Sequence, residues 1–161
     1  IFIGTNDRYW PLDALNQYWD GLRGDKYVVY VPNAGHGLSD LARVLGGIVA
    51  LHEQAQDRRQ LPRLDWEFRE TEDALELWVT SDQKPQAVSL WSSTSDNRDF
   101  RHAHWSSQPA GQDGERYVCK LPLPDKGCAA AFAELTFEGT IPFFLSSAVR
   151  IVDRNPPQQS E

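Results

Sequence analysis

Hydrophobic positions divide this chain into a first part of mixed periodicity and a second part in which they alternate. Residues 1–4 and 27–31 are short apolar runs, typical of parallel strands that are buried on both faces. Between them, apolar side chains recur at the i, i+3, i+4, i+7 spacing of one helix face. This spacing predicts a helix over residues 11–22, with Pro11 in its first turn.

A second helical stripe follows the second apolar run. It extends from Leu41 to Leu51 and predicts a helix that ends near residue 55. Ser39 or Asp40 can cap this helix, because their side-chain oxygens accept hydrogen bonds from the first free N–H groups. The polar segment 56–62 then resembles a linker.

From residue 64 onward the hydrophobic period is two, and turn residues separate the alternating runs. About seven short strands of this kind predict an antiparallel β-sandwich of the immunoglobulin or fibronectin type. We therefore expect an α/β unit over residues 1–60, a β-sandwich domain over 63–153 and a Pro/Gln-rich tail over 154–161. The expected fold class is α/β plus β.

Composition narrows the possible partners. The 161 residues are 40% hydrophobic and 24% charged, which is typical of a globular protein. No apolar run approaches the ~18 residues of a membrane span. The net charge of −7 repels phosphate backbones and argues against nucleic acid as a partner. The chain contains no Met and starts within an apolar run, so we expect a fragment of a longer protein.

Asp7 and His36 are the strongest candidates for chemistry. Asp7 follows the first apolar run, and His36 lies between two glycines after the second. Because parallel strands end at the same sheet edge, the two side chains can meet there as the acid and base that serve a nucleophile. In the alternative interpretation, Asp7 caps the helix that begins at Pro11 and His36 is an ordinary loop residue.

Three strings extend this interpretation: GTNDRYW at 4–10, ALNQYW at 14–19 and YVPNAGHGL at 30–38. They resemble the PhoPQ-activated pathogenicity-related protein family, which belongs to the α/β-hydrolase superfamily. The resemblance implies that the two apolar runs are the last two strands of an α/β-hydrolase sheet. It also implies that Asp7 is the triad acid and His36 the triad base, and that the protein is periplasmic or secreted.

A nucleophile is missing from this pattern. The chain contains no Gly-x-Ser-x-Gly string, and its serines lack the strand-to-helix context of such an elbow. We therefore expect an inert portion of a serine hydrolase that acts on an ester or amide. Its expected partner is the remainder of the parent hydrolase domain or a second copy, bound through the strand at 1–4. No residues indicate a cofactor.

Two further groups each leave alternatives open. His102 and His104 could share a zinc ion from one face of a strand, but no convincing third ligand follows, and an exposed polar loop is the alternative. Cys119 and Cys128 flank a turn and could form a disulfide or remain two buried thiols.

The tryptophans are the basis of the alternative functional hypothesis, in which the protein is a binding module. Trp66 follows the apolar phase of its strand and is expected in the core. Trp78 and Trp91 fall on the opposite phase, where they would form either a contact with the first part or an exposed aromatic patch. A patch would indicate a non-enzymatic module that binds protein or glycan, with a degenerate hydrolase-like part.

Overall fold

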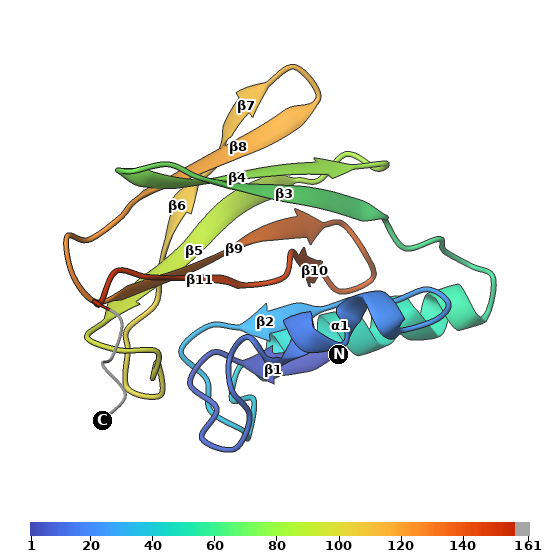
Figure 1. The fold of residues 1–161 in the computed structure, drawn as a ribbon. Helices are drawn as coiled ribbons and strands as arrows, with labels where there is room; N and C mark the ends of the chain where they lie inside the picture. The colour runs from blue at the N-terminus through green and yellow to red at the C-terminus, as the bar shows by residue number, and fades with distance from the viewer. Residues whose placement is uncertain (157–161) are drawn as a thin grey trace.

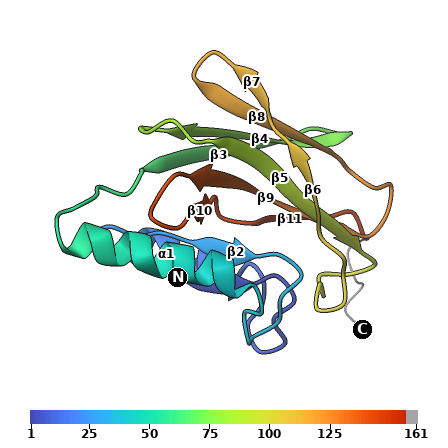
Figure 2. The ribbon, with the colours of Figure 1, turned by 180° about the vertical axis from the view of Figure 1, so that it is seen from behind.

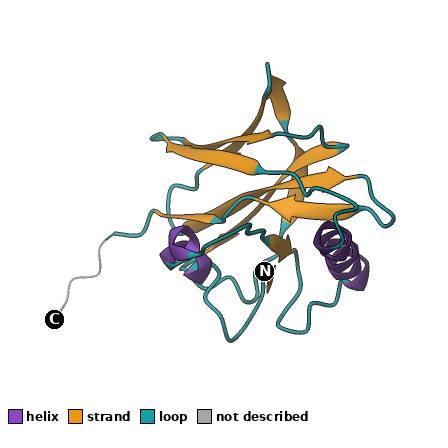
Figure 3. Ribbon diagram, turned by 90° about the vertical axis from the view of Figure 1, so that its right-hand side faces the viewer, coloured by secondary structure: helices purple, strands orange, loops and turns teal. Residues whose placement is uncertain are grey.

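The computed structural model describes residues 1–156 and arranges them in three layers (Figure 1). An outer sheet packs on a middle sheet, and the N-terminal part covers the other face of the middle sheet (Figures 1 and 2). Figure 3 shows that strands make up most of this arrangement and that the helices lie beside the N-terminal strands. The predicted tail at 154–161 falls largely outside the described residues.

The two apolar runs pair as predicted. Strands β1 (Phe2–Gly4) and β2 (Val29–Val31) are parallel, and Phe2 lies opposite Val29. The second edge of β2 is bound to the middle sheet, because Ser146 N–H donates to Val28 O at 2.8 Å. Within residues 1–156, no strand pairs with the second edge of β1. Two parallel strands do not by themselves establish an α/β-hydrolase fold.

The predicted helix over 11–22 is wrong. The segment forms two short 3₁₀ helices, η1 (Ala14–Gln17) and η2 (Trp19–Gly21). Its apolar residues do not share one buried face, because Leu15 is fully buried, Tyr18 is about half exposed, and Trp19 packs on both the cluster beneath the middle sheet and Trp66 of the outer sheet. The face predicted from the helical spacing is therefore not buried as a unit.

The second helix is confirmed as α1 (Leu41–Ala55). Asp40 is its N-cap, and its Oδ1 accepts a hydrogen bond from Arg43 N–H at 3.1 Å. Gly46 and Ala50 face the protein, whereas Leu41, Leu45, Ile48 and Leu51 are exposed. The helix therefore presents an apolar face to solvent.

Residues 64–156 form two packed antiparallel sheets, as predicted, with nine strands in this range in place of about seven. The outer sheet has the order β3-β4-β8-β7, and the middle sheet has the order β10-β9-β5-β6 with β11 also paired to β9. The outer strands are β3 (Leu64–Glu70), β4 (Ala74–Ser81), β8 (Arg116–Pro122) and β7 (Gly111–Asp113). The middle strands are β5 (Ala87–Ser95), β6 (Ser106–Pro109), β9 (Cys128–Phe137), β10 (Phe143–Ser146) and β11 (Arg150–Asp153).

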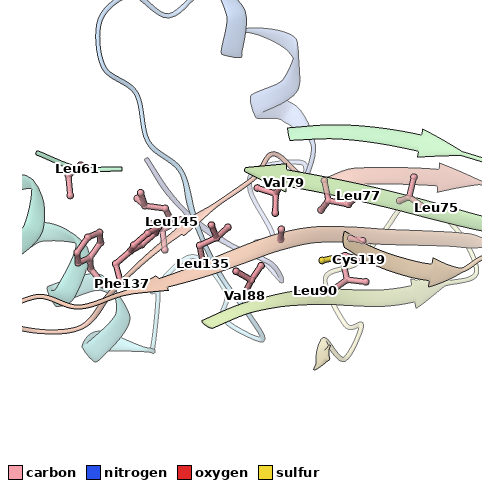
Figure 4. Packing of buried hydrophobic residues seen from close by; sticks show 14 of the residues in the cluster. Leu61, Leu75, Leu77, Val79, Val88, Leu90, Cys119, Leu135, Phe137 and Leu145 are labelled. Carbon is pink, nitrogen blue, oxygen red and sulfur yellow. The ribbon is translucent and has the colours of Figure 1, made fainter. Parts of the chain in front are cut away.

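Strand β9 belongs to two hydrophobic clusters at once. Its residues Leu135 and Phe137 join the cluster between the sheets, where Leu77 and Leu90 converge from facing strands (Figure 4). Its residue Phe132 faces the other way, into the cluster shared with the N-terminal part. The two units predicted on either side of residues 60–63 therefore both pack on β9. Their division into separate domains stays a prediction.

Candidate active site

Asp7 and His36 lie side by side at the ends of β1 and β2. Asp7 Oδ2 is 2.8 Å from His36 Nδ1, within the hydrogen-bond range expected of such a pair. The Asp7 side chain is 7% exposed and that of His36 is 57% exposed. The carboxylate is thus enclosed, while the imidazole reaches solvent.

The Asp7 carboxylate is fixed from its own loop. Its Oδ1 accepts hydrogen bonds from Tyr9 N–H at 2.8 Å and from Trp10 N–H at 3.4 Å. Burial opposes ionisation of Asp7, but the Tyr9 N–H, the His36 ring and the Trp10 N–H together lower its pKa below the ordinary value. The carboxylate is therefore ionised near neutral pH and can hold a proton on His36 Nδ1.

The loop that carries His36 is tightly constrained. Leu38 has a positive φ of 46°, and its N–H donates to Gly35 O at 3.0 Å, which closes a turn around His36. The Tyr9 ring meets the imidazole edge-on, with centroids 5.0 Å apart. Gly4 lets the loop approach β1, because a Cβ there would lie 2.4 Å from the carbonyl oxygens of Ala34 and Gly35.

The Asp7–His36 pair has no hydroxyl or thiol group bound to its imidazole in the described part of the chain. A cleft of about 440 Å³ opens beside Asp7 between residues 7–12 and 97–101. Tyr9 and Trp10 line this cleft and are exposed to solvent.

The family model of the PhoPQ-activated pathogenicity-related proteins matches residues 1–101, which include both loops of this site. The chain belongs to the PhoPQ-activated pathogenicity-related protein family. The match continues past the segment 56–62 and through β3, β4 and β5, so the family's sequence pattern includes much of the β-sheet part.

Other comparisons add little to the family assignment. A search of curated protein sequences gave no significant match. A solved structure titled "Crystal structure of Br derivative BhCBM56" is similar with a TM-score of 0.41 and 9% identity. The alignment covers 60% of this chain and 97% of that one. A likeness of this extent indicates no ligand or activity.

The remaining polar candidates of this family member are not assembled into sites. His102 and His104 lie in the loop between β5 and β6 rather than on a strand. Within residues 1–156, no group of three or more His, Cys, Asp or Glu side chains could hold a metal ion. Cys119 and Cys128 are free thiols, the first in the cluster between the sheets and the second in the cluster beneath the middle sheet.

Within residues 1–156, no helix is long and apolar enough to cross a bilayer.

Trp78 and Trp91 do not form a common patch. Trp78 lies on the outer sheet between the guanidinium groups of Arg69 and Arg116, which stack on its ring. Trp91 lies on the middle sheet, packs against the cluster beneath it, and donates from Nε1 to Glu134 Oε1 at 3.0 Å. Trp91 thus packs against a cluster that residues of both parts share, and its direct contact with the N-terminal part stays a prediction. The core position predicted for Trp66 holds in part, because this side chain is half-buried.

Two supporting groups escaped the sequence patterns. Glu134 is the one charged residue in the ten residues of β9, and it is buried against Arg43. That lone charge in an apolar strand was a usable signal. Asn6 and Asn33, which bind both site loops to the β-sheet part, carried no signal beyond their positions next to Asp7 and before His36.

Proposed function

We propose that this chain supplies the acid and the base of a serine-hydrolase triad for ester or amide hydrolysis. Asp7 is the acid, His36 is the base, and the nucleophilic serine comes from outside the 161 residues. The observation that carries this proposal is the 2.8 Å contact between an enclosed carboxylate and an exposed imidazole at the ends of two parallel strands. The order acid before histidine agrees with the α/β-hydrolase superfamily, in which the serine precedes both.

The chemistry follows from the orientation of the ring. Asp7 accepts a hydrogen bond from His36 Nδ1–H, which leaves the Nε2 lone pair free to act as a base. Nε2 takes the proton of the serine hydroxyl while the serine Oγ bonds to the substrate carbonyl carbon. The imidazolium then returns this proton to the departing alcohol or amine as the carbonyl–heteroatom bond breaks. Water releases the acyl group by the same two proton transfers.

The partner that completes the site is proposed to be a polypeptide segment that carries a Gly-x-Ser-x-Gly elbow and pairs with β1. Support comes from the second edge of β1, which no strand in residues 1–156 covers, from the exposed side chain of Ile1, and from exposed Leu45 and Ile48 on the helix whose Gly47 packs on Phe2. An unpaired edge selects an extended strand as its partner. A second copy would cover the edge but would bring no elbow, so the site would remain incomplete.

The test uses the intact polypeptide that contains these residues together with its nucleophile. A fluorophosphonate probe labels only an activated serine, and a p-nitrophenyl ester reports turnover. We expect His36→Asn to abolish labelling, and Asp7→Asn to lower kcat by about 10⁴-fold through loss of the correct tautomer.

The matched control is His52→Asn, which changes an exposed histidine on α1 and should leave both readouts unchanged. Labelling that persists at full rate in His36→Asn would contradict the proposal. So would an intact polypeptide that reacts with neither reagent.

A further inference from the structure

We propose that Asn6 and Asn33 are positioning residues that set the geometry of the Asp7–His36 pair by binding both loops to the segment 100–105 of the β-sheet part. The inference rests on the proposed function in that the pair is taken to be catalytic. The geometry itself, however, can be tested without a nucleophile. The segment 100–105, which includes His102 and His104 and forms no metal site in the described residues, is called the platform below because its backbone binds both loops.

Asn6 immediately precedes Asp7 and acts as a donor. Its Nδ2 group points into three carbonyl oxygens, those of Ala103 at 2.7 Å, Phe100 at 3.1 Å and Arg101 at 3.3 Å. Its Oδ1 accepts from Thr5 Oγ1 at 2.9 Å, and its backbone N–H donates to Ala34 O at 3.0 Å. The acid loop is therefore bound to the β5–β6 loop and to the histidine loop through one residue.

Asn33 precedes His36 by three residues and acts as donor and acceptor together. Its Nδ2 donates to Trp105 O at 2.9 Å, and its Oδ1 accepts from Trp105 N–H at 2.8 Å. Its backbone N–H donates to Thr5 Oγ1 at 2.8 Å. The residue has a φ of 56°, a conformation that asparagine tolerates better than most side chains.

The segment that these amides bind is itself anchored in the core. Trp105 and Phe100 are almost fully buried, and their rings lie 6.0 Å apart. Trp105 also packs on Phe132 of β9 at 5.5 Å, and Ser93 Oγ of β5 donates to His104 O at 2.8 Å. Two strands of the middle sheet thus hold the platform, and the platform holds both loops.

The two amides differ in chemistry, which makes the proposal specific. Asn33→Asp keeps the acceptor for Trp105 N–H and tolerates the positive φ, but it loses the donor and places an oxygen against one carbonyl oxygen, that of Trp105. An Asp at position 6 places a carboxylate against three carbonyl oxygens, which repel it. Asn33→Asp should therefore disturb the pair less than Asn33→Gly, whereas Asn6→Asp should disturb it more than Asn6→Ala.

The experiment reads the tautomer of His36 by ¹⁵N NMR on this 161-residue chain at alkaline pH. Asp7 accepts a hydrogen bond from Nδ1–H of His36, so the unsubstituted chain should show only the Nδ1–H tautomer of His36. We expect Asn33→Gly, which removes the side chain but accommodates the positive φ, to lower the Nδ1–H population several-fold. Asn6→Ala should do the same, and the amide spectra should show both variants folded.

The matched control is Asn16→Ala. The Asn16 Nδ2 group donates to Val149 O at 2.8 Å and also joins the N-terminal part to the β-sheet part, but away from the pair. Its removal should leave the tautomer unchanged. If Asn33→Gly does not fold, Asn6→Ala and the two Asp variants decide the question.

An unchanged Nδ1–H population in folded Asn6→Ala, or an Asp variant order opposite to the one above, would overturn the proposal. Failure of the hydrolase assay leaves this measurement intact, since no serine takes part in it. The two proposals can therefore fail separately.

Discussion

Arg43, in the first turn of α1, and Glu134, in the middle of β9, form a buried ion pair across 91 positions of sequence. Glu134 Oε1 also accepts a hydrogen bond from Trp91 Nε1, and the Arg43 guanidinium stacks on the Phe144 ring. Because α1 begins a few residues after His36, this pair fixes the far end of the histidine loop to the middle sheet.

Replacing Arg43 with Met should destabilise the protein by about 3–5 kcal/mol near neutral pH, because it leaves a buried carboxylate without its countercharge. Burial raises the pKa of Glu134, and the Arg43 charge opposes this rise. Without Arg43 the folded state holds the Glu134 proton to higher pH than the unfolded state does. The loss should therefore be small at acid pH and grow as the pH rises above about 4, the ordinary range of Glu.

Urea unfolding at several pH values measures this loss. Arg58→Met, which changes an exposed arginine just beyond α1, is the control and should leave the free energy of unfolding almost unchanged. A loss of equal size at every pH would show that Glu134 is not the group responsible.

The pH dependence of stability should also report the Asp7 carboxylate. Its pKa is lower in the folded state than in the unfolded chain, so it contributes stability above about pH 4 that disappears as the pH falls through the folded value. Asp7→Asn should therefore cost about 1–3 kcal/mol near neutral pH and less at pH 3. Urea titrations of both proteins at the two pH values test this, with the exposed Asp20→Asn as the charge-matched control.

A methyl group at Gly4 should separate β1 from the histidine loop. The added Cβ would meet two backbone carbonyl oxygens at 2.4 Å, and backbone cannot move aside cheaply. We expect Gly4→Ala to lower the free energy of unfolding by at least about 1–3 kcal/mol. Gly37→Ala, in the same loop but with no atom near the added Cβ, should be tolerated, and equal losses in both variants would contradict the steric explanation.

Neither cysteine should react readily while the protein is folded. Burial raises the pKa of Cys119 to about 11, and burial followed by the neighbouring Asp153 raises that of Cys128 to about 11. Thiolates are the reactive form, so Ellman's reagent should modify both groups slowly at neutral pH and quickly after unfolding. The non-reduced and reduced masses should show no internal disulfide; an oxidised mass in the folded chain would refute the assignment of free thiols.

The exposed apolar face of α1 should make the isolated chain self-associate. Leu45 and Ile48 are about half exposed and lie on the helix whose Gly47 packs on the Phe2 ring of β1. The double variant Leu45→Lys/Ile48→Lys should lower the mass seen by light scattering towards that of a monomer with little change in unfolding free energy. Ala50→Lys, on the buried face of the same helix, should instead unfold the chain.

If the unsubstituted 161-residue chain is already a stable monomer at high concentration, this result would argue against a missing partner on this surface. A double variant that associates as strongly as the parent would move the contact elsewhere. A dimer that forms through β1 alone would favour a second copy as the occupant.

The sequence predicted those elements whose apolar residues repeat with a regular period. Helix α1 has one buried side, and most strands after residue 63 alternate apolar and polar positions, whereas the exposed strands β6 and β7 carry no such alternation and were not predicted. The helix predicted over 11–22 was wrong although its spacing was helical, because Leu15 is buried while Tyr18, on the same predicted face, is about half exposed. Tertiary contacts outweighed helical spacing there.

The candidate site shows the same limit. Asp7 and His36 could be placed together from strand order, since parallel strands bring their ends to one edge. Asn6 and Asn33 could not be identified in advance, because their partners are backbone atoms of residues 100–105. Backbone carbonyls have no sequence signature, and only the folded loop shows which ones lie within reach.

Strand β9 has a consequence for the integrity of the molecule. Its two faces belong to different clusters, one that joins the outer sheet and includes Val29 and Ala50, and one formed largely with the N-terminal residues. If a protease cut the connection between α1 and β3, the two fragments should therefore stay associated. They should separate only when denaturant unfolds β9 and breaks the contacts that both fragments make with it.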